Sequence, residues 1–337
     1  MSWHKIIIKH EKVTADLTDY IIYIDLSLAT DNFWNSVKNG GGDIRIFKED
    51  KTIEQAREIV SCDTTTKKGE VYVKITGTLS GTINTVLYVY VDGIANDYAV
   101  TATYGRNNVW TENVRVHHMT TQADSAGNGS NLVLNNTTLS NGYLSCPGSG
   151  LGAKISSLAT LLTGQIYGVS ARIFLDESQS AYDMFIHSTY ELAKAIYIQI
   201  RTDTGQANVI KQNIYDGTTW YGETSYIDIT RGAWYTLVMI KDGTSLKTYI
   251  NGVKYQTATA PLNVPNPPSN KDVYLGSHSL NAHHLTGKID NVRLFGVSKS
   301  DELVLTEHNN QNDPATFYEI EDEAEPIINN LCQIIHY

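Results

Sequence analysis

Two pairs of adjacent histidines are the first residues whose type suggests chemistry. His117-His118 and His283-His284 carry imidazoles that suit a transition metal, and His278 is close to the second pair in sequence. Adjacent residues on a strand point to opposite faces, so neither pair can easily present both rings to one ion. The histidines therefore indicate half-buried or loop positions more strongly than a metal site.

Sequence motifs for nucleophilic, metal-dependent or phosphate chemistry are absent. The chain has no Gly-x-Ser-x-Gly, His-Glu-x-x-His or Gly-x-x-x-x-Gly-Lys-Ser/Thr sequence. The glycine cluster at 148–152 precedes neither a lysine nor a helix start, and the cluster at 40–42 leads into a strand, so both indicate turns. We therefore expect a protein that is not an enzyme.

Two adjacent aromatic residues stand in a segment typical of a loop, residues 218–222. Carbohydrate sites stack an aromatic ring on a sugar face and use Asn or Asp side chains for the hydroxyls, and such side chains lie in and just after the proline-rich loop 261–268. Packing at a hairpin end or against a neighbouring subunit is the alternative for the two aromatic residues. The predicted carbohydrate contacts are Trp220, Tyr221, Asn266, Asn270 and Asp272.

Charge and hydropathy exclude further classes of protein. Lys and Arg total 26 against 36 Asp and Glu, a net charge of −10, which argues against a nucleic-acid partner. No apolar run approaches the ~18 residues that cross a bilayer, and the N-terminus lacks the apolar core of a signal peptide. We expect a protein made in a cytosol, without membrane insertion.

Acidic residues concentrate at the C-terminal end of the chain. Residues 301–337 hold nine acidic side chains and no Lys or Arg, so almost the whole net charge lies there. The segment ends in an apolar stretch at 327–335, which favours docking onto a partner or a sister subunit. We expect removal of residues 319–337 to leave the rest of the chain folded.

Apolar and polar residues alternate with a period near two along most of the chain, which predicts antiparallel β-sandwiches. Asp242-Gly243 and Asn251-Gly252 separate three such runs within 234–256, and these dipeptides tolerate the positive φ of tight turns. The sequence therefore predicts a three-stranded meander there.

Helical signals are few. The segment that starts at Ser298 predicts a short capped helix running to about Asn309. A helix-like stretch at 53–59 is too short to stand alone. The fold class is therefore all-β.

Several segments of the second half resemble a known family. Residues 234–252, 285–295 and 300–317 resemble the central hairpins, the closing strand and the following tail of laminin-G-like (LamG, concanavalin A-like) jelly rolls. In the first half, residues 17–26, 33–34, 42–47 and 98–110 are similar to an uncharacterised β-sandwich domain. That domain commonly precedes such a jelly roll in tailed-phage virion proteins and bacterial cell-surface proteins.

The resemblance implies an order of domains. An N-terminal antiparallel β-sandwich of uncharacterised family would occupy residues 1–108, and a LamG-like (concanavalin A-like) jelly-roll sandwich would occupy residues 109–312. An acidic C-terminal tail with an apolar end, residues 313–337, would follow.

The resemblance also bears on metal and catalysis. Jelly rolls of this class often hold a structural Ca²⁺ through an Asp of the closing strand, and the matching position is Asp290. An ordinary hydrogen-bonded strand residue is the alternative. Laminarinase-type enzymes of the same fold carry Glu-x-Asp-x-x-Glu on one strand, and no such run lies on a predicted strand here.

The sequence thus predicts a non-enzymatic structural protein on the outside of a tailed-phage virion, as a tail appendage, fibre or capsid decoration protein. Its expected partners are other virion proteins of capsid or tail, further copies of itself as a homo-oligomer, and host surface glycans. A bacterial cell-surface adhesin is the first alternative. A glycan-degrading enzyme with an unrecognised site is the second.

Overall fold

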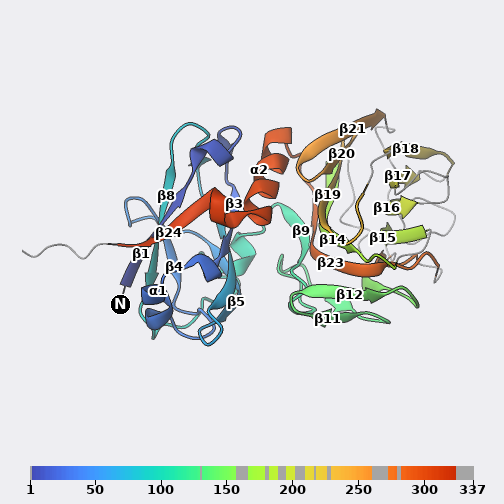
Figure 1. Cartoon of the computed structure of the whole chain (residues 1–337). Helices are drawn as coiled ribbons and strands as arrows, with labels where there is room; N and C mark the ends of the chain where they lie inside the picture. The colour runs from blue at the N-terminus through green and yellow to red at the C-terminus, as the bar shows by residue number, and fades with distance from the viewer. Residues whose placement is uncertain are drawn as a thin grey trace, which may run out of the picture.

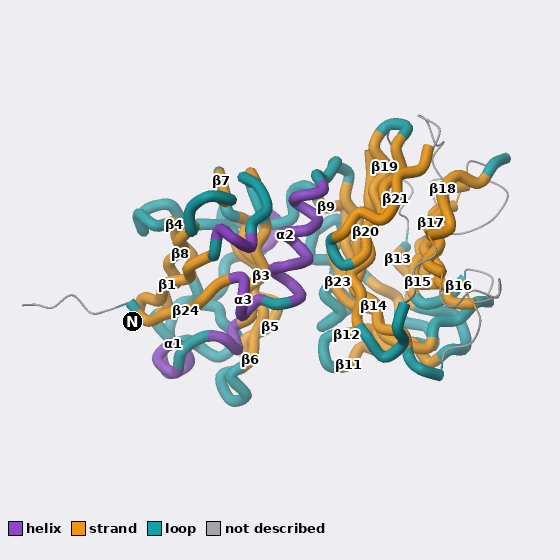
Figure 2. The backbone as a smooth tube through the Cα atoms, turned by 45° about the horizontal axis from the view of Figure 1, so that its top comes forward, coloured by secondary structure: helices purple, strands orange, loops and turns teal. Residues whose placement is uncertain are grey.

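The computed structural model shows two β-domains side by side, with helix α2 (Asp301–Asn312) between them (Figures 1 and 2). Among the residues that the structure describes, no helix combines the length and apolar character needed to cross a membrane. The described residues are 2–129, 131–156, 166–178, 182–188, 195–201, 209–215, 218–225, 229–259, 272–278 and 282–323.

The first domain packs two antiparallel sheets, of strand order β24-β1-β8-β4 and β3-β6-β5, beside a short β2-β7 pair. Strand alternation builds the core: Ile6 and Ile8 of β1 are buried, and the residues between them and beside them are half-buried. The elements are β1 (Ser2–Ile8), β2 (Leu17–Thr18), β3 (Ile21–Asp25), α1 (Asp31–Ser36), β4 (Arg45–Lys48), β5 (Arg57–Asp63), β6 (Lys68–Lys74), β7 (Thr78–Leu79) and β8 (Thr85–Val91), with short 3-10 helices at His10–Lys12, Leu26–Leu28 and Arg106–Asn108.

The helix-like stretch at 53–59, too short to stand alone, forms no helix, and strand β5 begins at Arg57. The Arg57 side chain is buried, and its guanidinium donates to the Ile44 carbonyl (2.5 Å) and to the Asp97 carboxylate (2.7 Å). These long-range contacts outweigh the weak local helical preference.

The C-terminal end of the described chain folds into this first domain. After α2, helix α3 (Pro314–Phe317) leads into β24 (Tyr318–Asp322), which pairs antiparallel with β1, with Ile6 opposite Ile320. Phe317 and Tyr318 are fully buried in the core of the first domain, and the Asp25 amide donates to the Tyr318 hydroxyl at 2.6 Å. Residues 313–322 are therefore structured, unlike the tail expected from 313 onward, whereas residues 324–337 lie outside the described part.

The second domain is a sandwich of two large antiparallel sheets. One has the order β11-β12-β23-β14-β19-β20-β21, with β9 also paired to β23, and the other has the order β10-β13-β22-β15-β16-β17-β18. The strands are β9 (Asn113–His117), β10 (Leu132–Val133), β11 (Thr138–Ser140), β12 (Tyr143–Pro147), β13 (Ala153–Ile155), β14 (Ile166–Leu175), β15 (Tyr182–Ser188), β16 (Ala195–Arg201), β17 (Val209–Tyr215), β18 (Trp220–Ser225), β19 (Trp234–Asp242), β20 (Ser245–Ile250), β21 (Val253–Thr259), β22 (Val273–Leu275) and β23 (Thr286–Phe295).

The turns and the helix predicted near the end of this domain are present. Strands β19, β20 and β21 form a meander whose turns use positive φ at Gly243, Asn251 and Gly252. The Ser300 side chain caps α2 by accepting from the Leu303 amide at 3.1 Å. On its other side the helix meets the first domain, where the Asn310 side chain accepts from the Tyr23 amide (2.7 Å) and donates to its carbonyl (2.9 Å).

Candidate functional site

The predicted aromatic pair lies on a strand rather than in a loop. Trp220 begins β18, the edge strand of the β10–β18 sheet, and pairs with Tyr215 of β17. Tyr221 is half-buried and packs against the core of the second domain. The Trp220 side chain lies outside the described residues.

Of the polar partners proposed for a sugar, the structure describes only Asp272. Asn266 and Asn270 lie outside the described residues. Asp272 precedes β22, and its carboxylate pairs with the Lys154 ammonium at 3.0 Å. Because β15, β16 and β17 separate β22 from β18, roughly 19 Å of sheet lies between the two strands at ~4.8 Å a step. One sugar ring cannot bridge that span, so Trp220 and Asp272 belong to different contacts.

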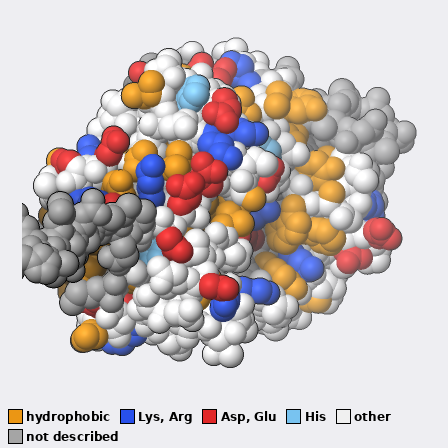
Figure 3. All heavy atoms as spheres, turned by 60° about the vertical axis from the view of Figure 1, so that its left-hand side comes forward, with side chains coloured by type: hydrophobic (Ala, Val, Ile, Leu, Met, Phe, Trp, Pro, Cys, Tyr) orange, Lys and Arg blue, Asp and Glu red, His pale blue; other side chains and the backbone are white. Residues whose placement is uncertain are grey.

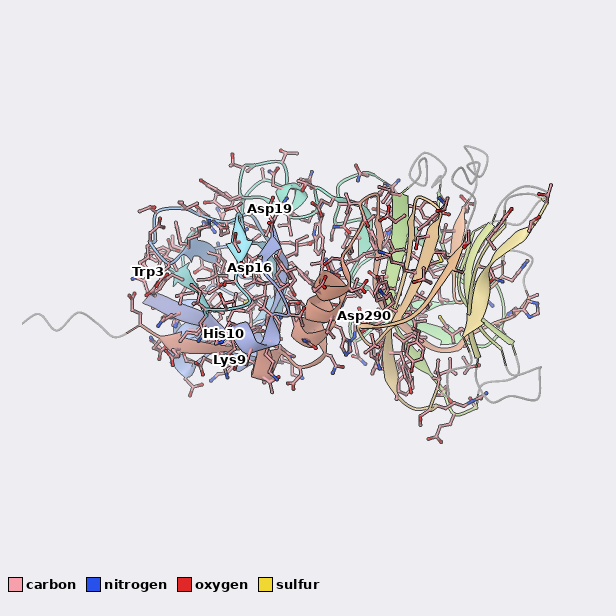
Figure 4. The ribbon with its side chains drawn as sticks, turned by 90° about the horizontal axis from the view of Figure 1, so that it is seen from above. Trp3, Lys9, His10, Asp16, Asp19 and Asp290 are labelled. Carbon is pink, nitrogen blue, oxygen red and sulfur yellow. The ribbon has the colours of Figure 1, made fainter. Side chains whose placement is uncertain are left out.

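Asp290 lies at the junction of the two domains, beside α2 (Figure 4). Its carboxylate faces the Arg172 guanidinium at 3.7 Å and accepts from the Asn291 side chain at 3.3 Å. Burial raises the pKa of Asp290 to about 7, against the lowering effect of Arg172. These surroundings do not fit Ca²⁺, because an arginine already occupies the cationic position and the described residues contain no group of three or more metal-ligating side chains.

A bulge explains why Asp290 and its neighbour face the other domain. The β14–β23 register shifts between Ser170 and Arg172, and Asn291 adopts a left-handed φ of 48°. A bulge of this kind re-aims side chains at the cost of a regular ladder. It turns the Asn291 side chain into a buried polar cluster at the junction of the two domains.

That buried cluster centres on the Glu58 carboxylate. Glu58 accepts from the Trp110 indole (2.5 Å) and the Ser125 hydroxyl (2.6 Å), and it lies 3.1 Å from the His118 Nε2. The other His118 nitrogen contacts Asn291 at 3.0 Å. Burial disfavours charge on both groups, but their mutual attraction and hydrogen bonds raise the pKa of His118 and lower that of Glu58. The cluster thus holds a buried His–Glu ion pair.

The cluster contains serine, histidine and an acid, yet its geometry is not that of a hydrolase triad. The Ser125 hydroxyl donates to Glu58 rather than to His118, so no base activates it. Ser125 and His118 are also 6% and 5% exposed, which leaves no room for a substrate. The cluster has a structural role. Its only signal in the sequence was the adjacent histidine pair His117-His118.

The two sheets of the second domain differ in what covers them. The outer face of the β11–β21 sheet packs Val238, Ile240 and Phe295 against Val304 of α2. The Arg293 guanidinium of the same face stacks 5.0 Å from the Trp110 ring of the domain junction. The β10–β18 sheet lies on the far side, away from the first domain (Figure 1). Ligand contact by this domain is therefore expected on the far sheet and its edges.

Comparison with known protein families agrees with this architecture. Residues 147–304 match the model of the concanavalin A-like lectin/glucanases superfamily. The second domain is a concanavalin A-like jelly roll. The all-β fold class predicted from the sequence is thereby confirmed. No curated protein matches the chain.

Solved structures show similarity at low sequence identity. Domain 4 of an extracellular arabinanase from Geobacillus stearothermophilus, solved with arabinotriose, is 18% identical over 58% of this chain and 98% of its own, with a TM-score of 0.47. The binding domain of botulinum neurotoxin serotype D is 14% identical over 59% of this chain, with a TM-score of 0.48. The chain spans about half of that neurotoxin structure, 51%.

Proposed function

We propose that the protein is a non-enzymatic structural protein on the outside of a tailed-phage virion, where its jelly roll contacts glycans of the host surface. The glycan part of the proposal rests on a difference in what covers the two jelly-roll sheets. One sheet is buried against α2 and the first domain, and the other faces away from both. In this proposal the first domain attaches the protein to the particle, and the β10–β18 sheet is the surface exposed to the host.

The virion part of the proposal rests on the sequence resemblance of the first domain, together with the way the chain is built. Strand β24 is the last described strand, and it pairs with β1, the first. The first domain therefore contains chain segments from before and after the jelly roll, and both segments attach the jelly roll to it. A buried ion pair and the α2 helix add to this connection. Such fixed attachment of the jelly roll suits a particle that must remain intact outside a cell.

The enzyme alternative makes a different prediction. Glycoside hydrolysis needs two carboxyl groups about 5–9.5 Å apart that both reach the sugar. Asp290 faces Arg172 at the domain junction, and Asp272 is paired with Lys154. Incubation with host polysaccharides should therefore release no reducing ends, and release that disappears with a single carboxylate substitution would overturn the proposal.

A binding experiment tests the glycan part directly. The full chain, fluorescently labelled, is applied to an array of bacterial surface polysaccharides, beside Trp220→Ala and a control, Trp3→Ala, which removes a half-buried ring of the first domain. We expect Trp220→Ala to lose about tenfold in affinity and the control to stay within about twofold, since an aromatic platform contributes one such stacking contact. Absence of any glycan binding by the wild-type chain would refute the glycan part.

Gold-labelled antibodies against the protein test the virion part. Labelling of the surface of purified phage particles is expected, at the capsid or the tail. Labelling of the outer surface of uninfected bacteria instead would favour the adhesin alternative.

A further inference from the structure

A cavity of about 480 Å³ opens on the first domain, between the end of β4, strand β7 and the start of β8. Its volume is within the range of small-ligand sites, ~300–1,000 Å³. The floor is apolar and includes Ile75 and Leu87, which are 1% and 0% exposed. The cavity belongs wholly to the first domain and shares no residue with the jelly roll.

The loop that forms one wall of this cavity is fixed in place. The Asp16 carboxylate accepts from the Gly81 amide at 2.8 Å, and the Asp19 carboxylate accepts from the Gly77 amide at 3.0 Å. At the far end of the loop, the Asn84 side chain accepts from the His10 amide at 3.0 Å. Asp16, Asp19 and His10 are labelled on the first domain in Figure 4. The wall is therefore formed before any ligand arrives, which lowers the entropic cost of binding.

Gly81 shows how closely this loop lies against the segment behind it. A Cβ atom built on Gly81 would stand 2.9 Å from the Ala15 carbonyl carbon, closer than side chains come to backbone. Only glycine permits this approach. The loop thus has a rigid back support and presents its other side to the cavity.

The cavity wall carries three polar side chains whose end groups have no hydrogen-bond or ion-pair partner within the described residues. Within the described residues, the Lys48 ammonium, the Glu49 carboxylate and the Thr78 hydroxyl make no hydrogen bond or ion pair, although all three line the cavity. The wall also carries Ile83, whose side chain is 69% exposed. A polar rim beside an exposed aliphatic side chain suits a ligand with hydroxyls on its edge and C–H groups on its face.

The charges of the wall select among such ligands. Lys48 contributes one positive charge, and Glu49 and Asp50 contribute two negative charges. The excess of one negative charge disfavours an anionic ligand, and the Lys48 ammonium weakens the attraction of the carboxylates for a cationic one. A neutral ligand avoids both costs and can still hydrogen-bond to all three groups.

We propose that this cavity of the first domain binds a neutral sugar residue, so that the protein has a second carbohydrate site apart from its jelly roll. The apolar face of the sugar rests on Ile83, and its hydroxyls meet Lys48, Glu49 and Thr78. This inference adds a second glycan contact, on the first domain. It rests on the proposed function only for the class of ligand.

Backbone-amide NMR of the deuterated full chain tests this site. The probes are glucose, galactose, mannose, rhamnose, N-acetylglucosamine and N-acetylgalactosamine, each titrated to about 50 mM because single sugars bind with millimolar constants. We expect at least one of them to shift the amides of residues 77–86. The variant Ile83→Ser should raise its dissociation constant at least about fivefold by removing apolar contact.

The matched control is Ile94→Ser, which removes an isoleucine of the same domain that is 75% exposed and does not line the cavity. It should leave the dissociation constant within about twofold. Shifts confined to β15–β18 would overturn the second site and leave the proposed jelly-roll contact standing. No shift anywhere with any probe would overturn the second site, and the polysaccharide array would then decide the jelly-roll contact separately. Equal losses in Ile83→Ser and Ile94→Ser would also refute the site.

Discussion

Replacing Phe317 by alanine should destabilise the first domain, although this residue follows the jelly roll in sequence. Phe317 is 0% exposed, and its ring lies 6.5 Å from that of Tyr318 in the core of the first domain. A buried Phe→Ala substitution costs ~3–5 kcal/mol, because transfer energy is lost and a cavity remains. Domains are stable by only ~5–15 kcal/mol, so the expected loss is a large part of the total.

Urea unfolding followed by tryptophan fluorescence measures this loss, with Trp34 of the first-domain core as the local probe. The control is Glu319→Ala, two residues further on in strand β24, which removes only an exposed carboxylate 3.9 Å from Lys9 and should cost less than ~1 kcal/mol. The reasoning is refuted if Phe317→Ala costs no more than Glu319→Ala. That result would mean that the segment of α3 and β24 adds little to the domain that it completes.

Three further predictions concern the C-terminus and the domain junction. Truncation after Glu323 should leave the melting temperature unchanged, whereas truncation after Asp313 removes β24 and should lower it by more than 10 °C, a shift of ~4–8 °C per kcal/mol for a small domain. Glu58→Gln should cost ~3–5 kcal/mol in urea unfolding, because it leaves His118 buried without its counter-charge. Since the folded pKa of His118 is raised, the stability it contributes is present below pH ~6.5 and is lost as pH rises through the folded pKa; the variant should lack this loss. The folded pKa of Asp290 is raised to about 7, so ionisation of this carboxyl costs stability as pH rises from ~4 toward 7. The variant Asp290→Asn should therefore be more stable than the wild-type protein at pH 8. Millimolar Ca²⁺ should not shift the melting temperature of either protein.

The turns of the meander and the start of helix α2 depend on residues that are neighbours in the sequence. The dipeptides at 242–243 and 251–252 specify their turns through positive φ, and the α2 helix starts where a serine can cap it. These features depend on a few neighbouring residues. The meander and the helix were therefore predictable from the sequence.

Strand β24 carried a local signal that its charge concealed. Tyr318 and Ile320 alternate with Glu319 and Glu321, which is the period of a half-buried strand. The acidic density of 319–325 favoured a solvated tail instead. Only the partner strand β1, more than 300 residues away, determines which face of the segment is buried. We therefore expect removal of residues 319–337 to destabilise the first domain, contrary to the sequence-based expectation.

The surroundings of Asp290 depend on long-range contacts in the same way. The partner of Asp290 is Arg172, on a different strand, and the bulge that brings them together leaves no mark in either segment. Long-range pairing of β14 with β23 decides this contact. On the face shown in Figure 3, acidic and basic side chains are interspersed with hydrophobic ones.

The fixed junction between the domains bears on how two weak sugar contacts add together. The His118–Glu58 pair and the stacking of Arg293 on Trp110 connect the domains through buried contacts rather than through a flexible linker. Two sites held at one separation raise the affinity only for a ligand that spans them, and then by far more than either contact alone. A long neutral polysaccharide should therefore bind the full chain more tightly than its own trisaccharide does, and Ile83→Ser should reduce the affinity for the polymer more than that for the trisaccharide bound at the jelly roll. Equal reductions for the two ligands would show that the sites act separately.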